Sequence, residues 1–348
     1  MKTSLKYLSI FVVAIITASC SKKTEVTRGF YAWQSHYDVD EVKNQKLFQS
    51  FAGERLYLKM FEVTYDEKSG AIPVSKTNTK LHNEFMSNAE LVPCVFIENE
   101  VLSKLSSIQL NELADNIIFL VNKYVDNEVF QYSAKNNTYT EIQLDCDWSK
   151  ANQNSYFELI KLIKEKSQKT VSCTMRLYPY KYRDEMGTPP VDRIMLLCYN
   201  LLNPTKNTDK NSILEIEELK KYIDFDTPYP VPVDVALPAY SSGYRFDQQR
   251  FAGIFHAVPE NFEEIAVATK DNLHFIVKED TSINHKYFRK GEKIKIERIS
   301  ESVLLEAAEL ISNHINQSEM NVVIYHLDHE EIYQYKHEIL DSVFSIFN

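Results

Sequence analysis

Glycine is scarce in this chain, and several motifs that depend on it are missing. Only 7 of the 348 residues are Gly, and no Gly-rich loop of the kind that cradles phosphate groups is present. The Gly-x-Ser-x-Gly elbow of serine hydrolases is also missing, so Ser35 and Ser149 are not expected to be nucleophiles. These absences disfavour nucleotide-dependent chemistry and serine hydrolysis, and we predict no cofactor.

Cysteine is limited to 5 residues, and no Cys-x-x-Cys pair indicates a zinc site. Four of them, Cys94, Cys146, Cys173 and Cys198, lie in apolar, strand-like runs and are expected to be small buried apolar residues. A metal site is one interpretation of the segment His326-Leu327-Asp328-His329, because a His and an Asp two residues apart on a strand point to the same side. No further His stands at ligand spacing, however, and a polar barrel mouth also explains these residues, so no metal is predicted.

Basic residues are fewer than acidic residues in this chain. The chain has 39 Lys and Arg against 49 Asp and Glu, a net charge of −10, which disfavours nucleic acid and anionic lipid surfaces as partners. The N-terminal apolar run, residues 7–16, is too short to span a bilayer.

The first twenty residues have the pattern of a secretory signal. Basic Lys2 and Lys6 precede the apolar run, and small residues lead to Cys20, as in the lipobox of bacterial lipoproteins, although Thr17 stands where Leu is more usual. We expect a signal peptide over 1–19, lipidation of Cys20 and a short tether to residue 28, which places the protein in the cell envelope. The alternative is an ordinary signal peptide with an incidental Cys.

Short apolar runs alternate with helix-length amphipathic segments along residues 29–348. Eight such runs, with helices between them in roughly 300 residues, predict a (β/α)₈ TIM barrel. The expected strands are residues 29–35, 55–63, 91–98, 141–148, 170–178, 193–200, 233–240 and 321–328.

Two segments depart from a simple repeat of strand and helix. Residues 65–70 carry a turn signal, which predicts a hairpin or long loop after the second strand. Residues 243–299 contain additional strand-like runs and are expected to form a small β-rich insertion between barrel strands 7 and 8. After it, residues 300–316 predict a helix with Ser300 as its N-cap.

The fourth expected strand ends in two acids that share one face. Alternation along a strand places Asp145 and Asp147 on the same side, with Cα atoms roughly 6.6 Å apart. This spacing allows the carboxyl separations that glycosidases use, about 5 to 9.5 Å, and mutual repulsion should raise one of the two pKa values. The alternative is that one Asp caps the next helix and the other binds a backbone amide.

In a barrel of this kind, the working residues lie at the carboxyl ends of the strands. We therefore expect Glu62, Asp145, Asp147 and Arg176 to be catalytic. Aromatic, acidic and amide side chains are typical of a carbohydrate site, where rings stack on sugar faces. The expected substrate-binding residues are Trp33, Gln34, Glu98, Trp148, Tyr178, Tyr199, Asn200, Tyr240, His326 and Asp328.

The stretch Leu144-Asp145-Cys146-Asp147-Trp148-Ser149 resembles the fourth-strand signature D-G-x-D-x-D-W-E of family-18 chitinase-like barrels. Asp145, Asp147 and Trp148 match this pattern, whereas Ser149 occupies the position of the Glu that is the general acid of the family. More broadly, the segments FYAWQ, IQLDCDW, PPVDRIMLLCYN and VVIYHLD resemble a group of bacterial lipoproteins with glycoside-hydrolase-like barrels, a group without an assigned reaction.

A hydrolase of this kind needs a proton donor in another position. We favour Asp147 as donor, since it lies nearer the strand end, with Asp145 held ionised by Arg176. The other possibility is donation from Glu62, Glu98 or Asp328, with the pair stabilising oxocarbenium-like charge. The sequence thus predicts a monomeric, lipid-anchored glycoside hydrolase that acts on a glycan. Its alternatives are a non-catalytic glycan-binding barrel and an envelope interaction protein without a sugar site.

Overall fold

The computed structural model describes residues 24–34, 41–78, 81, 89–126, 139–206, 208–223, 227–247, 250–283 and 286–348. Cys20 and the predicted signal peptide lie outside these ranges. None of the helices within them is both long and apolar enough to cross a membrane.

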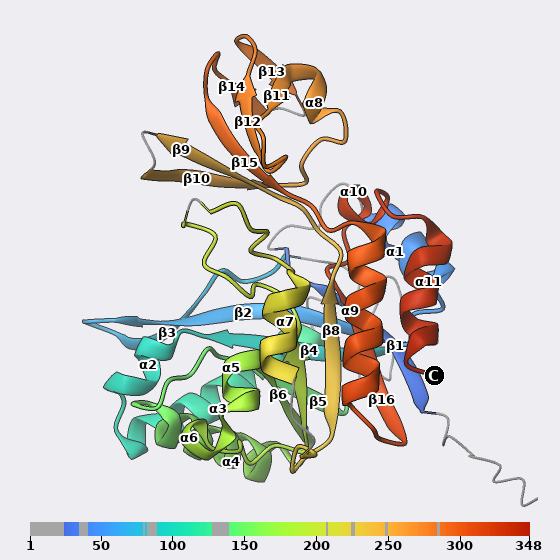
Figure 1. Ribbon diagram of the computed structural model, residues 1–348. Coiled ribbons are helices and arrows are strands. Elements are labelled where there is room, and N and C mark those ends of the chain that lie inside the picture. The colour runs from blue at the N-terminus through green and yellow to red at the C-terminus, as the bar shows by residue number, and fades with distance from the viewer. Residues whose placement is uncertain are drawn as a thin grey trace, which may run out of the picture.

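Eight parallel strands close into a barrel, because β1 pairs with both β2 and β16. Long β2 continues into an antiparallel hairpin with β3 that projects beyond the barrel (Figure 1). The barrel strands and β3 are β1 (Glu25–Ala32), β2 (Arg55–Asp66), β3 (Gly70–Val74), β4 (Glu90–Ile97), β5 (Glu141–Asp145), β6 (Thr170–Arg176), β7 (Arg193–Leu197), β8 (Val233–Pro238) and β16 (Glu319–Tyr325).

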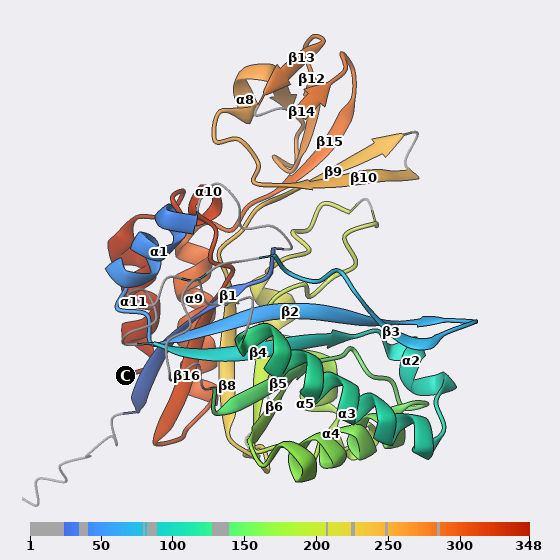
Figure 2. The ribbon, with the colours of Figure 1, turned by 180° about the vertical axis from the view of Figure 1, so that it is seen from behind.

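Helices cover the outside of the barrel, and α3 and α4 lie side by side on one flank (Figure 2). The helices are α1 (Glu41–Ser50), α2 (Asn99–Lys104), α3 (Ser107–Tyr124), α4 (Gln153–Ser167), α5 (Leu177–Lys181), α6 (Arg183–Met186), α7 (Ile216–Ile223), α9 (Glu301–His314), α10 (His329–Ile332) and α11 (His337–Ile346). The (β/α)₈ barrel predicted from the sequence is confirmed.

Local signals explain several of these boundaries. The Ser300 side chain accepts a hydrogen bond from the Val303 amide and caps α9, as predicted. At the β2–β3 turn, Asp66 accepts hydrogen bonds from the amides of Lys68 and Ser69, and Gly70 has a φ of 75°, which favours glycine. The hairpin expected over residues 65–70 is therefore present.

The first strand begins earlier than expected. Residues 25–28 were assigned to the tether, but they belong to β1 and pair with β16 from Glu25 onward. Arg28 also binds Asp341 of α11 at 2.5 Å. Backbone pairing with the last barrel strand thus fixes a segment whose polar composition suggested a linker.

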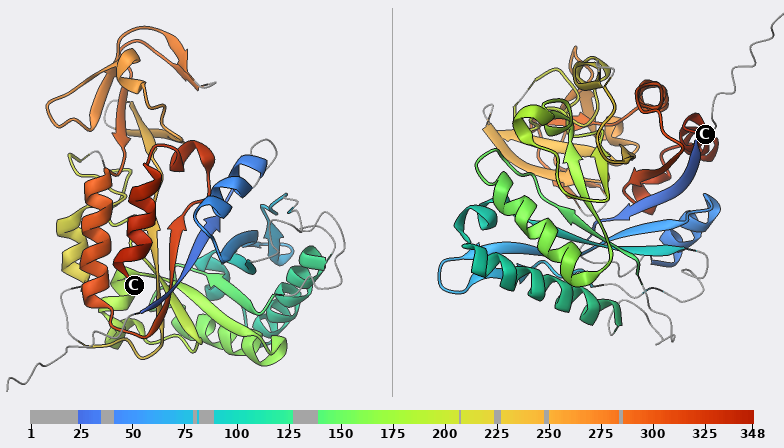
Figure 3. Two further views of the ribbon diagram at one scale, coloured as in Figure 1. Left: turned by 90° about the vertical axis from the view of Figure 1, so that its right-hand side faces the viewer. Right: turned by 90° about the horizontal axis from the view of Figure 1, so that it is seen from below.

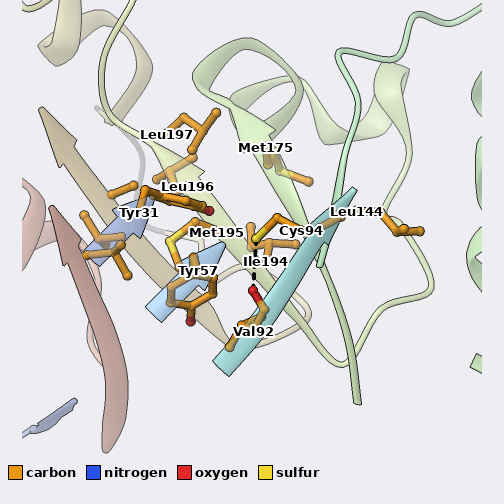
Figure 4. Packing of buried hydrophobic residues seen from close by; sticks show 14 of the residues in the cluster. Tyr31, Tyr57, Val92, Cys94, Leu144, Met175, Ile194, Met195, Leu196 and Leu197 are labelled. Atoms are coloured by element: carbon orange, nitrogen blue, oxygen red, sulfur yellow. Dashed lines mark hydrogen bonds between the residues drawn. The ribbon is translucent and has the colours of Figure 1, made fainter. Parts of the chain in front are cut away.

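The amino-terminal half of the barrel interior is filled by a layer of ion pairs and, above it, a layer rich in large side chains. At the amino ends of the strands, Arg55 pairs with Glu90 at 2.6 Å and with Glu141 at 2.8 Å, while Arg193 pairs with Asp234 at 2.6 Å. Above this layer, Tyr31, Tyr57, Cys94 and Met195 point toward one another between the strands (Figure 4). These layers fill the barrel from its amino end, so space for a ligand lies toward its carboxyl end.

A β-rich insertion between β8 and β16 stands over the end of the barrel toward which the strands run (Figure 3). It has its own core, which includes Phe255, Phe262, Phe275 and Phe288. Its elements are β9 (Ser242–Asp247), β10 (Arg250–His256), α8 (Phe262–Ile265), β11 (Ala266–Ala268), β12 (His274–Val277), β13 (Thr281–Ile283), β14 (Lys286–Phe288) and β15 (Lys293–Glu297). The insertion predicted between barrel strands 7 and 8 is confirmed.

Buried polar contacts fix the insertion to the barrel. The Glu331 carboxylate of α10 accepts hydrogen bonds from the amide and hydroxyl of Ser241 and from the Ala257 amide, at 2.6 to 2.9 Å. On the other side, Lys295 and Glu297 form a fully buried pair at 2.6 Å, and Lys295 also donates to the Lys210 carbonyl. These contacts hold the ends of β9 and β10 near the barrel mouth.

Candidate active site

Two cavities share a wall at the carboxyl ends of the barrel strands. The smaller, about 220 Å³, is called the barrel cavity, and the larger, about 880 Å³, lies between the barrel and the insertion and is called the junction cavity. The barrel cavity is lined by Tyr31, Trp33, Glu62, Phe96, Asp145, Asp147, Thr174, Arg176, Leu197, Tyr199, Asn200 and Tyr325. The junction cavity is lined by Trp33, Gln34, Arg176, Leu177, Tyr178, Tyr199, Asn200, Leu201, Leu202, Asn203, Pro204, Tyr222, Tyr240, Ser242, Tyr244, Ile254, His256, Tyr325, His326 and Asp328.

Asp145 is the last residue of β5, and its carboxyl lines the barrel cavity. It accepts a hydrogen bond from the Thr174 hydroxyl at 2.5 Å. Burial raises the pKa of Asp145 to about 6, and the negative charge of Asp147 acts in the same direction, while the Thr174 hydrogen bond opposes them. Asp145 is therefore a carboxyl that holds its proton up to nearly neutral pH.

Asp147 is tied to Arg176 by two hydrogen bonds, from Nε to Oδ1 at 2.8 Å and from Nη2 to Oδ2 at 3.0 Å. This is the bidentate geometry that suits a guanidinium and a carboxylate. Burial lowers the pKa of Arg176, but the hydrogen bond and charge of Asp147 outweigh it and raise this pKa. The side chain of Asp147 remains 53% exposed, at the mouth of the barrel cavity.

The expected hydrogen-bonded pairing of Arg176 with Asp145 is wrong, because Arg176 binds Asp147; the role of Asp147 as proton donor stays a prediction. Leu144 pairs with Cys173 in the β5–β6 register, so the next residues, Asp145 and Thr174, lie beside each other. Two positions further, Asp147 meets Arg176. The register therefore gives the arginine to the outer aspartate and leaves the inner one with a neutral hydroxyl.

A third carboxyl lines the barrel cavity from β2, which only β4 separates from β5. Glu62 on β2 pairs in register with Phe96, which pairs with Asp145, so Glu62 and Asp145 lie level on strands two positions apart. At the usual strand spacing their Cα atoms are about 9 to 10 Å apart. Glu62 binds the ammonium of buried Lys59 at 2.6 Å.

Aromatic rings form the wall that the two cavities share. Tyr325 stacks on Tyr199 with ring centroids 5.0 Å apart and meets Tyr240 edge to face at 5.5 Å, and Trp33 lies 6.4 Å from it. Tyr178, at the rim of the junction cavity, is 46% exposed. The structure thus brings the predicted residues Trp33, Tyr178, Tyr199 and Tyr240 together.

Polar side chains complete the junction cavity. Gln34 donates a hydrogen bond to Asp328, and Tyr240 donates one to Asn200 at 2.5 Å. Asp328 also caps α10 by accepting from the Glu330 amide. Among the described residues, the buried Nδ1 atom of His326 has no hydrogen-bond partner. All four predicted residues, Gln34, Asn200, His326 and Asp328, therefore line this cavity.

Two predicted substrate-binding residues do not line either cavity. Trp148 is 6% exposed, packs on Tyr156 at 5.3 Å and donates its indole N–H to the Met186 carbonyl. Glu98 accepts a hydrogen bond from the Thr64 hydroxyl, outside both cavities. The structure places Trp148 in the layer between barrel and helices, on the opposite face of the chain from the two aspartates.

Ser149 stands where the family-18 signature has its acid, and its contacts are structural. Its amide and hydroxyl both donate to the Asn152 side-chain oxygen, at 2.8 and 3.2 Å, in the turn before α4. Ser149 lines neither cavity.

Sequence reasoning missed several residues that line the cavities. Tyr325 precedes His326 in the last barrel strand, and strand alternation assigned it to the other face. Both line the junction cavity, because β16 ends at Tyr325 and the alternation of side chains does not continue to His326. Ser242, Tyr244 and His256 come from the insertion. The rule that working residues lie at the carboxyl ends of barrel strands does not predict the position of its side chains. In the described part of the chain, no cluster of three or more His, Cys, Asp or Glu is arranged to hold a metal ion.

Comparison with known proteins identifies the fold. No protein-family model matches the chain, and no curated protein matches it either. Among solved structures, the spore cortex-lytic enzyme SleL from Bacillus cereus aligns with 93% of this chain and 75% of its own, at a TM-score of 0.55 and 14% identity. A chitinase from Chromobacterium violaceum aligns over 92% and 98%, at a TM-score of 0.52 and 9% identity. The chain therefore has a glycoside-hydrolase-like TIM barrel, in line with its distant similarity to chitinase-like barrels.

Proposed function

We propose that this protein is a glycoside hydrolase that binds a glycan in the joined cavities and uses Asp145 as its proton donor. The observation that carries the proposal is the position of Asp145 on the barrel cavity, beside an aromatic wall, with a pKa raised to about 6. A general acid works best when its pKa lies near the working pH. Glycosidases generally need one carboxyl that is protonated and one that is ionised.

Two other carboxyl groups line the barrel cavity and can serve as the partner of Asp145. Asp147 lies two residues after Asp145, beyond the end of β5, but Arg176 engages both of its oxygens. Glu62 lines the same cavity from β2, with only β4 between its strand and that of Asp145, and the described contacts of its carboxylate use one oxygen, which binds Lys59. Because the two carboxyls of a glycosidase flank the scissile bond, Glu62 is the better base or nucleophile. The Asp147–Arg176 pair is then assigned to holding sugar hydroxyls at the mouth.

The proposal also includes a place in the cell. The signal-like residues 1–19 and Cys20 support a lipoprotein that is anchored in the cell envelope, where its substrate would be an envelope or extracellular glycan. Labelling with a radioactive fatty acid tests this part. The wild type should be labelled and a Cys20→Ala variant should not, whereas equal labelling of both would contradict the anchor.

A second candidate, non-catalytic glycan binding, has one specific observation in its favour. Ser149 stands at the position of the family-18 general acid, and its amide and hydroxyl both bind the Asn152 side chain in the turn before α4. A barrel without that acid would keep the aromatic wall and bind sugars without cleaving them. The two candidates differ in whether new reducing ends appear.

The test is to incubate the purified protein with peptidoglycan fragments, N-acetylglucosamine oligomers and neutral polysaccharides, and to measure reducing ends. A hydrolase should release them, and Asp145→Asn should lower the rate by at least about 100-fold. Asp115→Asn on α3, which removes a carboxylate paired with Lys166 outside both cavities, is the matched control. Binding without release would favour the second candidate, and neither binding nor release would contradict both.

A further inference from the structure

The charges that line the junction cavity are unbalanced. Arg176 and Asp328 are the residues of fixed charge that line it in the described chain, and Arg176 is neutralised by its bidentate pair with Asp147. Asp328 accepts hydrogen bonds from Gln34 and from the Glu330 amide, both neutral donors, and within the described residues it has no ion pair with Lys or Arg. The cavity therefore presents an uncompensated carboxylate.

The two imidazoles of the cavity do not supply the missing positive charge. Burial lowers the pKa of His326 to about 4, and burial followed by the charge of Lys286 lowers that of His256. Asp328 acts in the opposite direction on both rings but does not outweigh these effects. Lys286, on β14 of the insertion, lines neither cavity. At neutral pH the cavity is thus negative, with neutral imidazoles.

The aromatic wall adds to this preference for positive charge. Tyr199, Tyr240 and Tyr325 surround one another with ring centroids 5.0 to 6.3 Å apart, and Trp33 lies beside them. The faces of aromatic rings carry negative potential and attract ammonium groups, most strongly where water is excluded. A carboxylate beside such rings is the chemistry that recognises an organic cation of modest size.

We propose that the junction cavity selects a sugar with a protonated free amine, so that the ligand is a glycan containing unacetylated amino sugars. This inference rests on the proposed function, which supplies the sugar, and adds the charge class of its substrate. Asp328 pairs with the ammonium group, and the tyrosines contact the sugar ring. Acidic glycans are excluded because the cavity offers them no free cationic side chain among the described residues.

The experiment compares two ligands that differ mainly in charge. Binding of glucosamine and N-acetylglucosamine oligomers of equal length is measured by calorimetry at about pH 6.5, where the free amines are largely protonated, and at about pH 9.5, where they are neutral. We expect the glucosamine oligomer to bind at least about tenfold more tightly at the lower pH, and this preference to disappear at the higher one.

Variants assign the preference to one side chain. Asp328→Asn should abolish it, and the fold should persist because Asn caps helices as well as Asp does. Glu330→Gln removes an exposed charge two residues away and outside both cavities, and should keep the preference.

Two results would overturn the inference while the proposed function stands. One is equal or tighter binding of the acetylated oligomer, which would mean that glycans bind without selection for the amine. The other is no binding of either oligomer by a protein that releases reducing ends from an acidic or neutral glycan. A protein that neither binds nor cleaves any glycan would instead contradict the proposed function itself.

Discussion

Arg176 binds both carboxylate oxygens of Asp147 and leaves Asp145, two residues earlier, to the Thr174 hydroxyl. This arrangement separates the two acids chemically. The outer aspartate is paired with a permanent cation, and the inner one is buried beside a neutral donor with a pKa of about 6. Two residues of the same type, two positions apart, thus have different electrostatic surroundings because of their neighbours on β6.

The raised pKa of Asp145 predicts how stability depends on pH. Because this pKa lies above that of an unfolded chain, the folded protein binds the proton more readily, and the corresponding stabilisation is lost as pH rises from about 4 to about 6. The Asp145→Asn variant has no carboxyl at this position, so it lacks this loss of stability with rising pH. Between about pH 4 and pH 8 the variant should gain about 1 to 3 kcal/mol of unfolding free energy relative to the wild type, as measured by urea denaturation.

Burial also raises the pKa of Glu331, to about 7, so Glu331 likewise lowers the unfolding free energy as pH rises. This contribution is the same in the wild type and in the variant, so the difference between them reports on Asp145. A constant difference between wild type and variant at all pH values would show that Asp145 does not titrate in this range.

Glu62 and Asp147 are distinguished by their neutral amide variants. We expect Glu62→Gln to lower hydrolysis by at least about 100-fold with little change in glycan affinity, because Glu62 lines the barrel cavity together with Asp145 and is the proposed base or nucleophile. Asp147→Asn should mainly weaken binding, since its carboxylate organises Arg176 at the mouth. Steady-state kinetics separate the two effects, and the reverse pattern would make Asp147 the second catalytic carboxylate.

Trp148 is expected to act through stability rather than sugar contact. Trp148→Ala should cost about 3 to 5 kcal/mol of unfolding free energy, because the ring packs on Tyr156 and Phe157 in a buried layer. Trp148→Phe should cost less, and both folded variants should bind glycan normally. Denaturation and calorimetry test this, and weakened binding at unchanged stability would contradict the assignment.

Glu331 positions the insertion against the barrel. Glu331→Ala leaves the amides of Ser241 and Ala257 without their acceptor, so hydrogen exchange in β9 and β10 should become faster, and unfolding should cost about 1 to 3 kcal/mol less. Exposed Glu330→Ala on the same helix is the control and should change neither quantity. Unchanged exchange at Ser242 and His256 in the Glu331 variant would show that other contacts hold this wall.

The barrel was predictable because its strands carry strong local signals. The apolar runs of β4 and β8, the Ser300 cap and the turn at Asp66 and Gly70 are each formed by residues close in sequence. Strand alternation also placed Asp145 and Asp147 on one face. These features depend on local chemistry that a single sequence contains.

The parts that were missed depend on contacts between distant segments. The partner of Arg176 is decided by the β5–β6 register, and the place of Tyr244 and His256 is decided by how the insertion folds back over the barrel. Trp148 was assigned to sugar binding through a resemblance, although alternation put it opposite the aspartates, where the structure has it.

The central claim is that Asp145 donates the proton that cleaves a glycosidic bond, and the pH dependence of hydrolysis tests it most directly. With a glycan that the protein cleaves, kcat/KM of the wild type should fall as pH rises above about 6, as Asp145 loses its proton. Asp145→Asn should lower the rate by at least about 100-fold at the optimum and remove this limb of the profile. A variant that keeps both the rate and the profile of the wild type would contradict the account.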